Sequence, residues 1–163
     1  TYDNSLDKEV VYCGGLDLTS QSTVERISAG KLVLSPTRTY APILAKILKE
    51  YRGKIDGLVH CSGGAQTKVL HFLNDDCCVI KDNLFPIPPL FSMIQEQSKT
   101  DWKEMYKVFN MGHRMEIYTD EKTAEDLINI SKSFNVDAQI VGRVEKSETK
   151  SVKIYSPYGE FIY

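Results

Sequence analysis

Hydrophobic and polar residues alternate in blocks along the chain, and these blocks predict a succession of short helices and strands. Hydrophobic residues recur at helical spacing over residues 43–51, and Pro42 just before them falls in the tolerated first turn. The mostly apolar run 55–61 predicts a buried strand, which ends at the glycines of 62–64. The apolar positions of 69–73 then predict a short helix, and 77–80 predict a second strand.

The second half of the chain continues this pattern. It predicts helices over 86–94 and 101–109, a strand over 115–118, a helix over 120–134, a strand over 138–144 and a hairpin over 152–163. The turn of that hairpin, Ser156–Gly159, has proline second and glycine fourth, as a type I turn favours. Helices and strands that alternate and end in strands predict an α+β or mixed α/β fold, with one sheet covered by helices.

Composition places the chain among ordinary globular proteins. Hydrophobic residues make up 42% of the 163 residues and charged residues 26%, which argues against disorder. The net charge of -2 gives no reason to expect a nucleic-acid partner, and no apolar run reaches the ~18 residues that span a membrane. The four cysteines form no C-x-x-C pair, so we expect reduced thiols in a cytoplasmic protein.

The start of the chain is its least regular part. Residues 1–30 hold polar clusters around one short apolar stretch, with no signal peptide and no initiator Met. We therefore expect 1–30 to be an arm or linker that could lie along another domain, and 31–163 to be a folded domain that ends in the hairpin.

The first stretch that could carry chemistry is a strand that runs into glycines. Ser62, Gly63 and Gly64 follow His60 and precede a predicted helix. Backbone N–H groups at such a joint favour an anion, and the glycines allow a ligand to approach closely. An ordinary turn between a strand and a helix explains the same pattern.

Two further stretches lie beside predicted helix ends. Arg38 could fork onto a phosphate while Thr37 donates a hydroxyl, although a helix cap with a surface arginine fits equally well. Asn110 and Gly112 could face a ligand near His113, although a simple helix terminus accounts for much of this joint. No two histidines have a recognised zinc spacing, so no metal site is expected from this chain alone.

Taken in order, these stretches resemble the phosphoribosylformylglycinamidine cyclo-ligases, also called aminoimidazole ribonucleotide (AIR) synthetases. The segment 36–40 (PTRTY) resembles the family's P-T-R-I-Y, and 60–65 (HCSGGA) its H-I-T-G-G-G. The segment 86–91 (PIPPLF) is similar to P-x-P-P-x-F, 109–115 (FNMGHRM) to F-N-M-G-x-G-M, and 140–144 (IVGRV) to V-I-G-x-V. An ordered set of motifs is far more specific than any one of them.

The resemblance implies the C-terminal domain of this enzyme, from a divergent bacterial branch, and residues 1–30 would then be a linker or arm from a missing N-terminal domain. Its fold would be α+β, with three α/β/α layers, a mixed sheet and partly ferredoxin-like topology. The family closes the imidazole ring of aminoimidazole ribonucleotide in purine synthesis, with ATP phosphorylating the formyl oxygen of formylglycinamidine ribonucleotide. ATP and Mg²⁺ would be held mainly by the missing N-terminal domain, and the full-length protein would be a homodimer.

By this resemblance the chain supplies one wall of the reaction cleft and is inactive alone. Ser62, Gly63 and Gly64 would bind an anion, and His60 would orient their loop. Thr37 and Arg38 would neutralise phosphate, while Asn110 and Gly112 would line the ribonucleotide. No residue is assigned as an acid or base.

Departures from the family pattern leave other interpretations open. Ala65 replaces a glycine, Lys68 an acid and Arg114 a glycine, so substrate preference could differ. Formylglycinamidine ribonucleotide synthetase, selenophosphate synthetase, thiamine-monophosphate kinase and a hydrogenase maturation factor share the same architecture. A non-catalytic module that binds a phosphorylated metabolite is the alternative from a different class.

Overall fold

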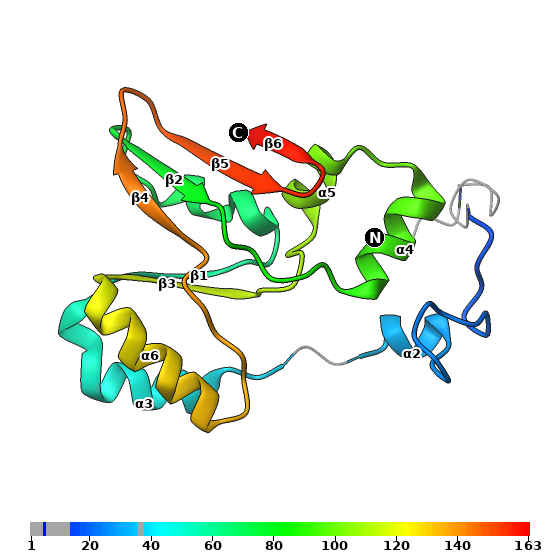
Figure 1. Ribbon diagram of the computed structural model, residues 1–163, viewed down its shortest axis with the longest axis horizontal. Coiled ribbons are helices and arrows are strands. Elements are labelled where there is room, and N and C mark those ends of the chain that lie inside the picture. The colour runs from blue at the N-terminus through cyan, green and yellow to red at the C-terminus, as the bar shows by residue number, and fades with distance from the viewer. Residues whose placement is uncertain (1–4, 6–13, 36–37) are drawn as a thin grey trace.

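Six strands of the described residues form two separate sheets, and helices pack against both (Figure 1). This computed structural model describes residue 5 and residues 14–35 and 38–163. The helices are α2 (Ala29–Val33), α3 (Ala41–Tyr51), α4 (Pro89–Ser98), α5 (Trp102–Val108) and α6 (Glu121–Ser133), with 3-10 helices η1 (Arg52–Lys54) and η2 (Ala65–His71). The strands are β1 (Ile55–His60), β2 (Cys77–Lys81), β3 (Met115–Thr119), β4 (Gly142–Lys146), β5 (Ser151–Ser156) and β6 (Gly159–Ile162).

The larger sheet is mixed, with the strand order β4-β2-β5-β6. β2 pairs antiparallel with β4 and parallel with β5, and β5 pairs antiparallel with β6. β1 and β3 form an antiparallel ribbon of their own, with Val59 opposite Glu116. The α+β fold with a mixed sheet is confirmed, although the pattern of the sequence led us to expect one sheet and the strands form two.

Two hydrophobic clusters hold these elements together. One cluster joins β1, β2 and β5 to η2 and α5, and its centre includes Val59, Tyr106 and Val152. The other cluster packs α3 and α6 against the ribbon through Ile43, Ile47 and Leu127. The ribbon therefore lies between the α3–α6 pair and the rest of the domain, and both of its faces are covered (Figure 1).

Local sequence signals explain where the helices begin. Pro42 and Pro89 lie in the first turns of α3 and α4, where a missing N–H costs nothing. The Asp120 carboxylate accepts from the backbone N–H of Thr123 at 2.9 Å and so caps α6, while Asp101 caps α5. The helix expected after the glycines is present as the 3-10 helix η2.

The prediction of a strand over 138–144 is wrong in its boundaries. β4 begins only at Gly142, because residues 138–141 run alongside Asn83 instead of pairing along a strand. Asn83 Nδ2 donates to the carbonyl of Ile140 at 2.7 Å, and Gln139 Nε2 donates to the carbonyl of Asn83 at 2.7 Å. At Gly142, which pairs with Lys81, an added Cβ would collide with the carbonyl oxygen of Ile80, so the close approach of β4 to β2 requires glycine.

The ends of the described chain fit the remaining expectations to different degrees. The hairpin is confirmed, since β5 and β6 are joined through Pro157 and Tyr158. The residues before α2 contact α4, where Gly15 N–H donates to Gln97 Oε1 at 2.6 Å. The division at residue 30 stays a prediction. None of the helices in the described part of the chain is long and apolar enough to cross a membrane.

Candidate functional site

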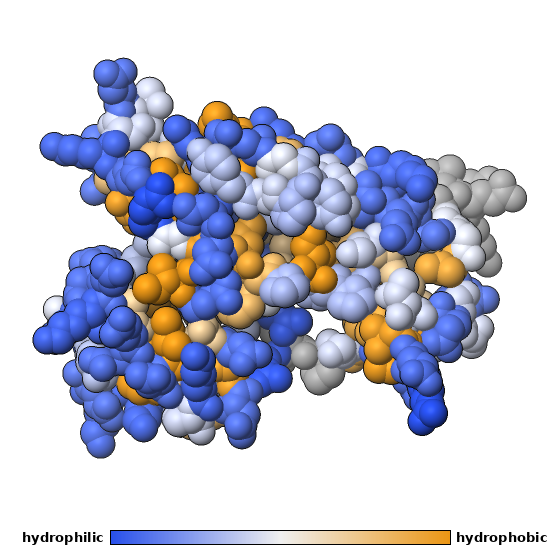
Figure 2. All heavy atoms as spheres, in the orientation of Figure 1, coloured by the Kyte–Doolittle hydropathy of each residue, from blue (hydrophilic) through white to orange (hydrophobic). Residues whose placement is uncertain are grey.

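A cleft of about 1480 Å³ runs between the larger sheet, the β1–β3 ribbon and the α3–α6 pair. Its walls include Arg38 before α3, Lys81 at the end of β2, and Gly112 and His113 before β3. Segment 138–141 forms part of another wall. Figure 2 shows hydrophobic side chains along the middle of this face, between the polar surfaces of the upper sheet and the lower helices. The cleft thus combines an apolar lining with a few polar groups, as ligand sites commonly do.

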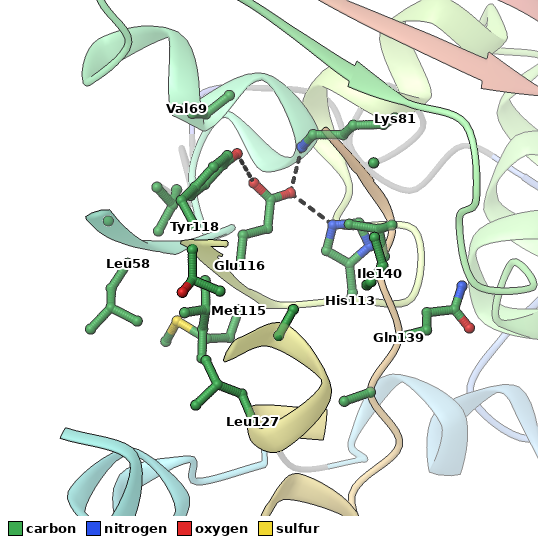
Figure 3. Close-up of a pocket in the computed structure, with 18 of the residues that line it drawn as sticks. Leu58, Val69, Lys81, His113, Met115, Glu116, Tyr118, Leu127, Gln139 and Ile140 are labelled. Carbon is green, nitrogen blue, oxygen red and sulfur yellow. Dashed lines mark hydrogen bonds and ion pairs between the residues drawn. The ribbon is translucent and has the colours of Figure 1, made fainter. Parts of the chain in front are cut away.

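At the bottom of the cleft, Glu116 accepts three hydrogen bonds, from Lys81 on β2, from His113 before β3 and from Tyr118 on β3 (Figure 3). Its Oε1 accepts from Lys81 Nζ, which also forms an ion pair with it, and lies 2.8 Å from His113 Nε2. Its Oε2 accepts from the Tyr118 hydroxyl at 2.6 Å. Lys81, Glu116 and His113 are all buried. A buried carboxylate needs such partners, because an unpaired charge is costly away from water.

The pKa values of the cluster follow from this arrangement. Burial alone would raise the pKa of Glu116, but the hydrogen bond from His113 and the charge of Lys81 outweigh burial and lower that pKa to about 2. Burial, and then the negative charge of Glu116, raise the pKa of the Cys61 thiol to about 12. The same two causes raise the pKa of Tyr118. At neutral pH the cluster therefore holds a carboxylate, a neutral thiol and a neutral phenol.

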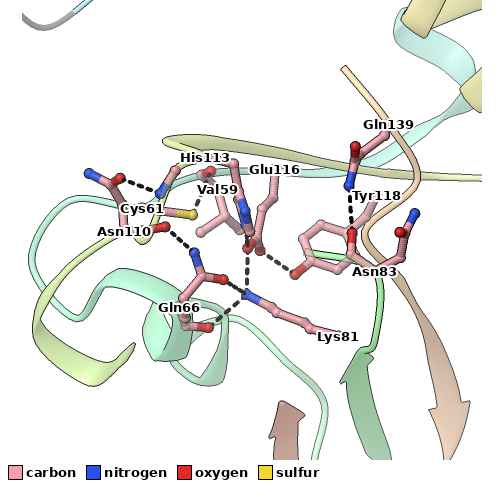
Figure 4. Close-up of polar contacts among 11 residues, drawn as sticks. Val59, Cys61, Gln66, Lys81, Asn83, Asn110, His113, Glu116, Tyr118 and Gln139 are labelled. Atoms are coloured by element: carbon pink, nitrogen blue, oxygen red, sulfur yellow. Dashed lines mark hydrogen bonds and ion pairs between the residues drawn. The ribbon is translucent and has the colours of Figure 1, made fainter. Parts of the chain in front are cut away.

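Gln66 on η2 links this cluster to the glycine loop and to the loop before β3 (Figure 4). Its Nε2 donates to the carbonyl of Asn110 at 2.5 Å. Its side-chain and backbone oxygens both accept from Lys81 Nζ, at 3.1 and 2.7 Å. The backbone N–H of Cys61 also donates to the carbonyl of Arg114 at 2.8 Å. Two loops far apart in sequence are thus held side by side.

The structure brings some of the predicted site residues together. Gly63 and Gly64 have positive φ angles of 50° and 91°, so this turn needs glycine, and the loop they form lies beside Asn110 through Gln66. Ser62 Oγ lies 3.4 Å from His60 Nδ1 within the same loop. Of the remaining predicted residues, Thr37 lies outside the described residues.

Asn110 and Arg38 make structural contacts, in line with the structural alternatives that the sequence left open for them. The Asn110 side chain accepts from the backbone N–H of Gly112 at 3.1 Å, which shapes its own turn. Gly112 lines the cleft with a φ of 120°. Arg38 also lines the cleft, and its Nη1 donates to the carbonyl of Asn135 at 3.1 Å, just after α6. Arg38 is therefore anchored at the far end of the cleft wall.

The sequence reading missed the buried cluster itself. The alternation Met115-Glu116-Ile117-Tyr118 predicted only a strand and did not single out Glu116, which is buried in the structure. A lysine that directly follows the apolar run 77–80 was the available signal for Lys81. Lys81 and Glu116 can be recognised as partners only when β2 and β3 are placed side by side.

Three of the buried side chains also lie close enough to share a metal ion. Potential ligand atoms of Cys61, His113 and Glu116 all lie within 4.8 Å of one another. However, the ammonium of Lys81 and the hydroxyl of Tyr118 already engage the carboxylate, and the thiol is neutral. The arrangement is that of a hydrogen-bonded network balanced by one ammonium group.

A family model described as AIR synthase related protein, C-terminal domain, matches residues 9–155. The chain belongs to this family. The loops at 60–65 and 109–115 and the segment 140–144 around Gly142 all lie within the matched residues.

Individual relatives agree with the family match. A phosphoribosylformylglycinamidine cyclo-ligase from Syntrophus aciditrophicus is 34% identical over 148 residues, which cover 88% of this chain and 42% of the relative. The Bacillus subtilis cyclo-ligase is 36% identical over 122 residues, which cover 73% of this chain and 34% of that relative. The chain therefore spans about two fifths of the length of such relatives. Its assignment to a bacterial branch stays a prediction.

A solved structure supports the fold alone. HypE, a hydrogenase maturation protein of E. coli, has a TM-score of 0.58 and is 18% identical, covering 85% of this chain and 41% of that protein. At this identity the likeness concerns the arrangement of helices and strands and not the reaction.

Proposed function

We propose that this chain is the C-terminal domain of an ATP-dependent cyclo-ligase that converts formylglycinamidine ribonucleotide to aminoimidazole ribonucleotide in purine synthesis. The observation that carries the proposal is the identity of 34% to a named cyclo-ligase over 88% of the chain. The adjacent glycine loop and Asn110–Gly112 turn, which match two family motifs, supply a wall on which such a substrate could be held.

The residues of this wall suggest a division of labour. The backbone N–H groups of Ser62, Gly63 and Gly64 would bind an anionic group, with His60 orienting the loop. Arg38, together with Thr37, would neutralise phosphate charge, and Asn110 with Gly112 would line the ribonucleotide. The wall would act by positioning and charge stabilisation, since ring closure onto an activated carbon needs no protein nucleophile.

ATP and Mg²⁺ enter the proposal as groups held outside this chain. ATP would supply the activation of the formyl oxygen, so that this oxygen leaves as phosphate when the ring closes. Among the acids that line the cleft, Asp82 is already bound to Arg143 at 2.5 Å, and the buried Glu116 is bound to Lys81. These two carboxylates do not fit a metal site, and from the family resemblance we place Mg²⁺ and ATP mainly on an N-terminal domain.

The remaining features of the proposal concern the whole protein. We infer that the chain acts together with its own N-terminal domain, in a homodimeric and cytoplasmic enzyme without a nucleic-acid or membrane partner. The isolated chain would be inactive, because it would lack the groups that hold ATP.

The test is the activity of the full-length protein. It should convert formylglycinamidine ribonucleotide, ATP and Mg²⁺ to aminoimidazole ribonucleotide, with one ADP for each ring closed, while the 163-residue chain should convert none. ATP hydrolysis without ring closure by a folded full-length protein would instead favour a sister enzyme with another substrate. If neither reaction occurs, a binding module is favoured.

A further inference from the structure

The buried ring of His113 has one nitrogen with a partner and one without. Nε2 lies 2.8 Å from the Glu116 carboxylate. Nδ1 is buried and has no hydrogen-bond partner within the described residues. The His113 side chain is only 7% exposed, so water does not readily satisfy Nδ1. Buried polar atoms are nearly always paired, and an unpaired one at a cleft calls for an explanation.

The Glu116 carboxylate decides which nitrogen carries the hydrogen. Because Glu116 is ionised, it can only accept, so the Nε2 of His113 must be the donor. Lys81 already supplies the positive charge that balances Glu116. In the tautomer that carries its hydrogen on Nε2, Nδ1 bears a lone pair that can accept a hydrogen bond.

The surroundings of the ring place this lone pair at the cleft. His113 follows Gly112, and both residues line the cleft. Figure 3 shows the ring between Glu116 and Ile140, and Phe85 lies on another side with its ring centre 6.2 Å away. Ile140 is itself 41% exposed, so the cover over the ring is thin. A small shift of segment 138–141, which is held to Asn83, would open Nδ1 to a ligand.

We propose that His113 Nδ1 is a substrate-binding group that accepts a hydrogen bond from an N–H of the ligand, namely the amidine of formylglycinamidine ribonucleotide. This inference rests on the proposed function for the identity of the ligand. Glu116 acts as a positioning residue, since its hydrogen bond fixes the tautomer and the orientation of the ring. In the family motif F-N-M-G-x-G-M this histidine occupies the variable position, so the acceptor would be particular to chains like this one.

A direct test uses ¹⁵N NMR of the full-length protein with labelled histidine. Without ligand, His113 should show the tautomer with hydrogen on Nε2. Saturating formylglycinamidine ribonucleotide should then shift the Nδ1 signal markedly and leave the Nε2 signal almost unchanged. An Nδ1 signal that stays in place while the protein turns over substrate would overturn the inference and leave the proposed function intact. A wild-type protein that closes no ring overturns both.

Kinetics of matched variants provide a second, independent readout. His113→Leu should raise the KM for the ribonucleotide by roughly tenfold or more, the value of one buried hydrogen bond, with the KM for ATP unchanged. His113→Asn places an amide oxygen near the position of Nδ1 and should recover most of this loss. His71→Leu, at an exposed position on η2, is the control and should change neither KM. Equal losses in the Leu and Asn variants, or an unchanged KM, would contradict the inference.

Discussion

Lys81 at the end of β2 and Glu116 on β3 form a buried ion pair that joins the two sheets of the domain. The two residues lie 35 positions apart in the chain. Gln66, His113 and Tyr118 complete their hydrogen bonds, so neither charge is left without partners. The cluster therefore couples the packing of the sheets to the loops that form the cleft wall.

Lys81→Met should destabilise the domain by roughly 3–5 kcal/mol, because it leaves the Glu116 charge buried without its cation. Urea unfolding would measure the loss. Lys146→Met, on the exposed face of β4, is the matched control and should change the free energy of unfolding by less than about 0.5 kcal/mol. Adding Glu116→Gln to Lys81→Met should restore part of the stability, since the unpaired charge is then gone. Equal effects of the Lys81 and Lys146 variants would contradict this account.

Stability should fall in acid through Glu116. The pKa of its carboxyl is lowered to about 2 in the folded chain from an ordinary value of 4.5, so the unfolded chain takes up the proton first. The stabilisation is then fully present above about pH 4.5 and is lost as the pH falls toward 2. Unfolding free energies measured across this range should show a slope that Glu116→Gln flattens. Glu160→Gln, at an exposed position on β6, should leave the slope unchanged.

Gly142→Ala should destabilise the domain by about 1–3 kcal/mol, since the added Cβ would force β4 away from Ile80 on the neighbouring strand β2. Thermal unfolding followed by circular dichroism would detect the change. Gly53→Ala is the control, because nothing lies within 4 Å of a Cβ added there. A Gly142 variant as stable as the Gly53 variant would show that β4 can move away from Ile80 at no cost in stability.

Arg38→Ala tests the phosphate role assigned in the proposed function. The hydrogen bond from Arg38 to the carbonyl of Asn135 is exposed, so its loss should cost less than about 1 kcal/mol of stability. In the full-length enzyme the KM for the ribonucleotide should rise about tenfold, as loss of a charge-assisted hydrogen bond predicts. Arg52→Ala, in η1, serves as the exposed control. A change in stability without a change in KM would assign Arg38 a purely structural role.

Much of the local structure could be predicted from the sequence because its signals are local. Helical spacing of apolar residues, prolines in first turns and aspartate caps depend on neighbours within a few positions, and α3, α4 and α6 follow them. The glycines at 63 and 64 predicted a turn, in which both residues have positive φ angles, and the ordered motifs indicated the family.

The tertiary structure alone decided the division into two sheets, the start of β4 and the buried cluster. Alternation along β3 could place Glu116 on one face, but it could not show that a second layer covers that face. Likewise, the need for glycine at position 142 depends on Ile80, a residue on the neighbouring strand β2. A charged side chain becomes part of a buried site only when distant segments exclude water around it and supply its hydrogen-bond partners. A local sequence pattern does not show which distant segments will pack together.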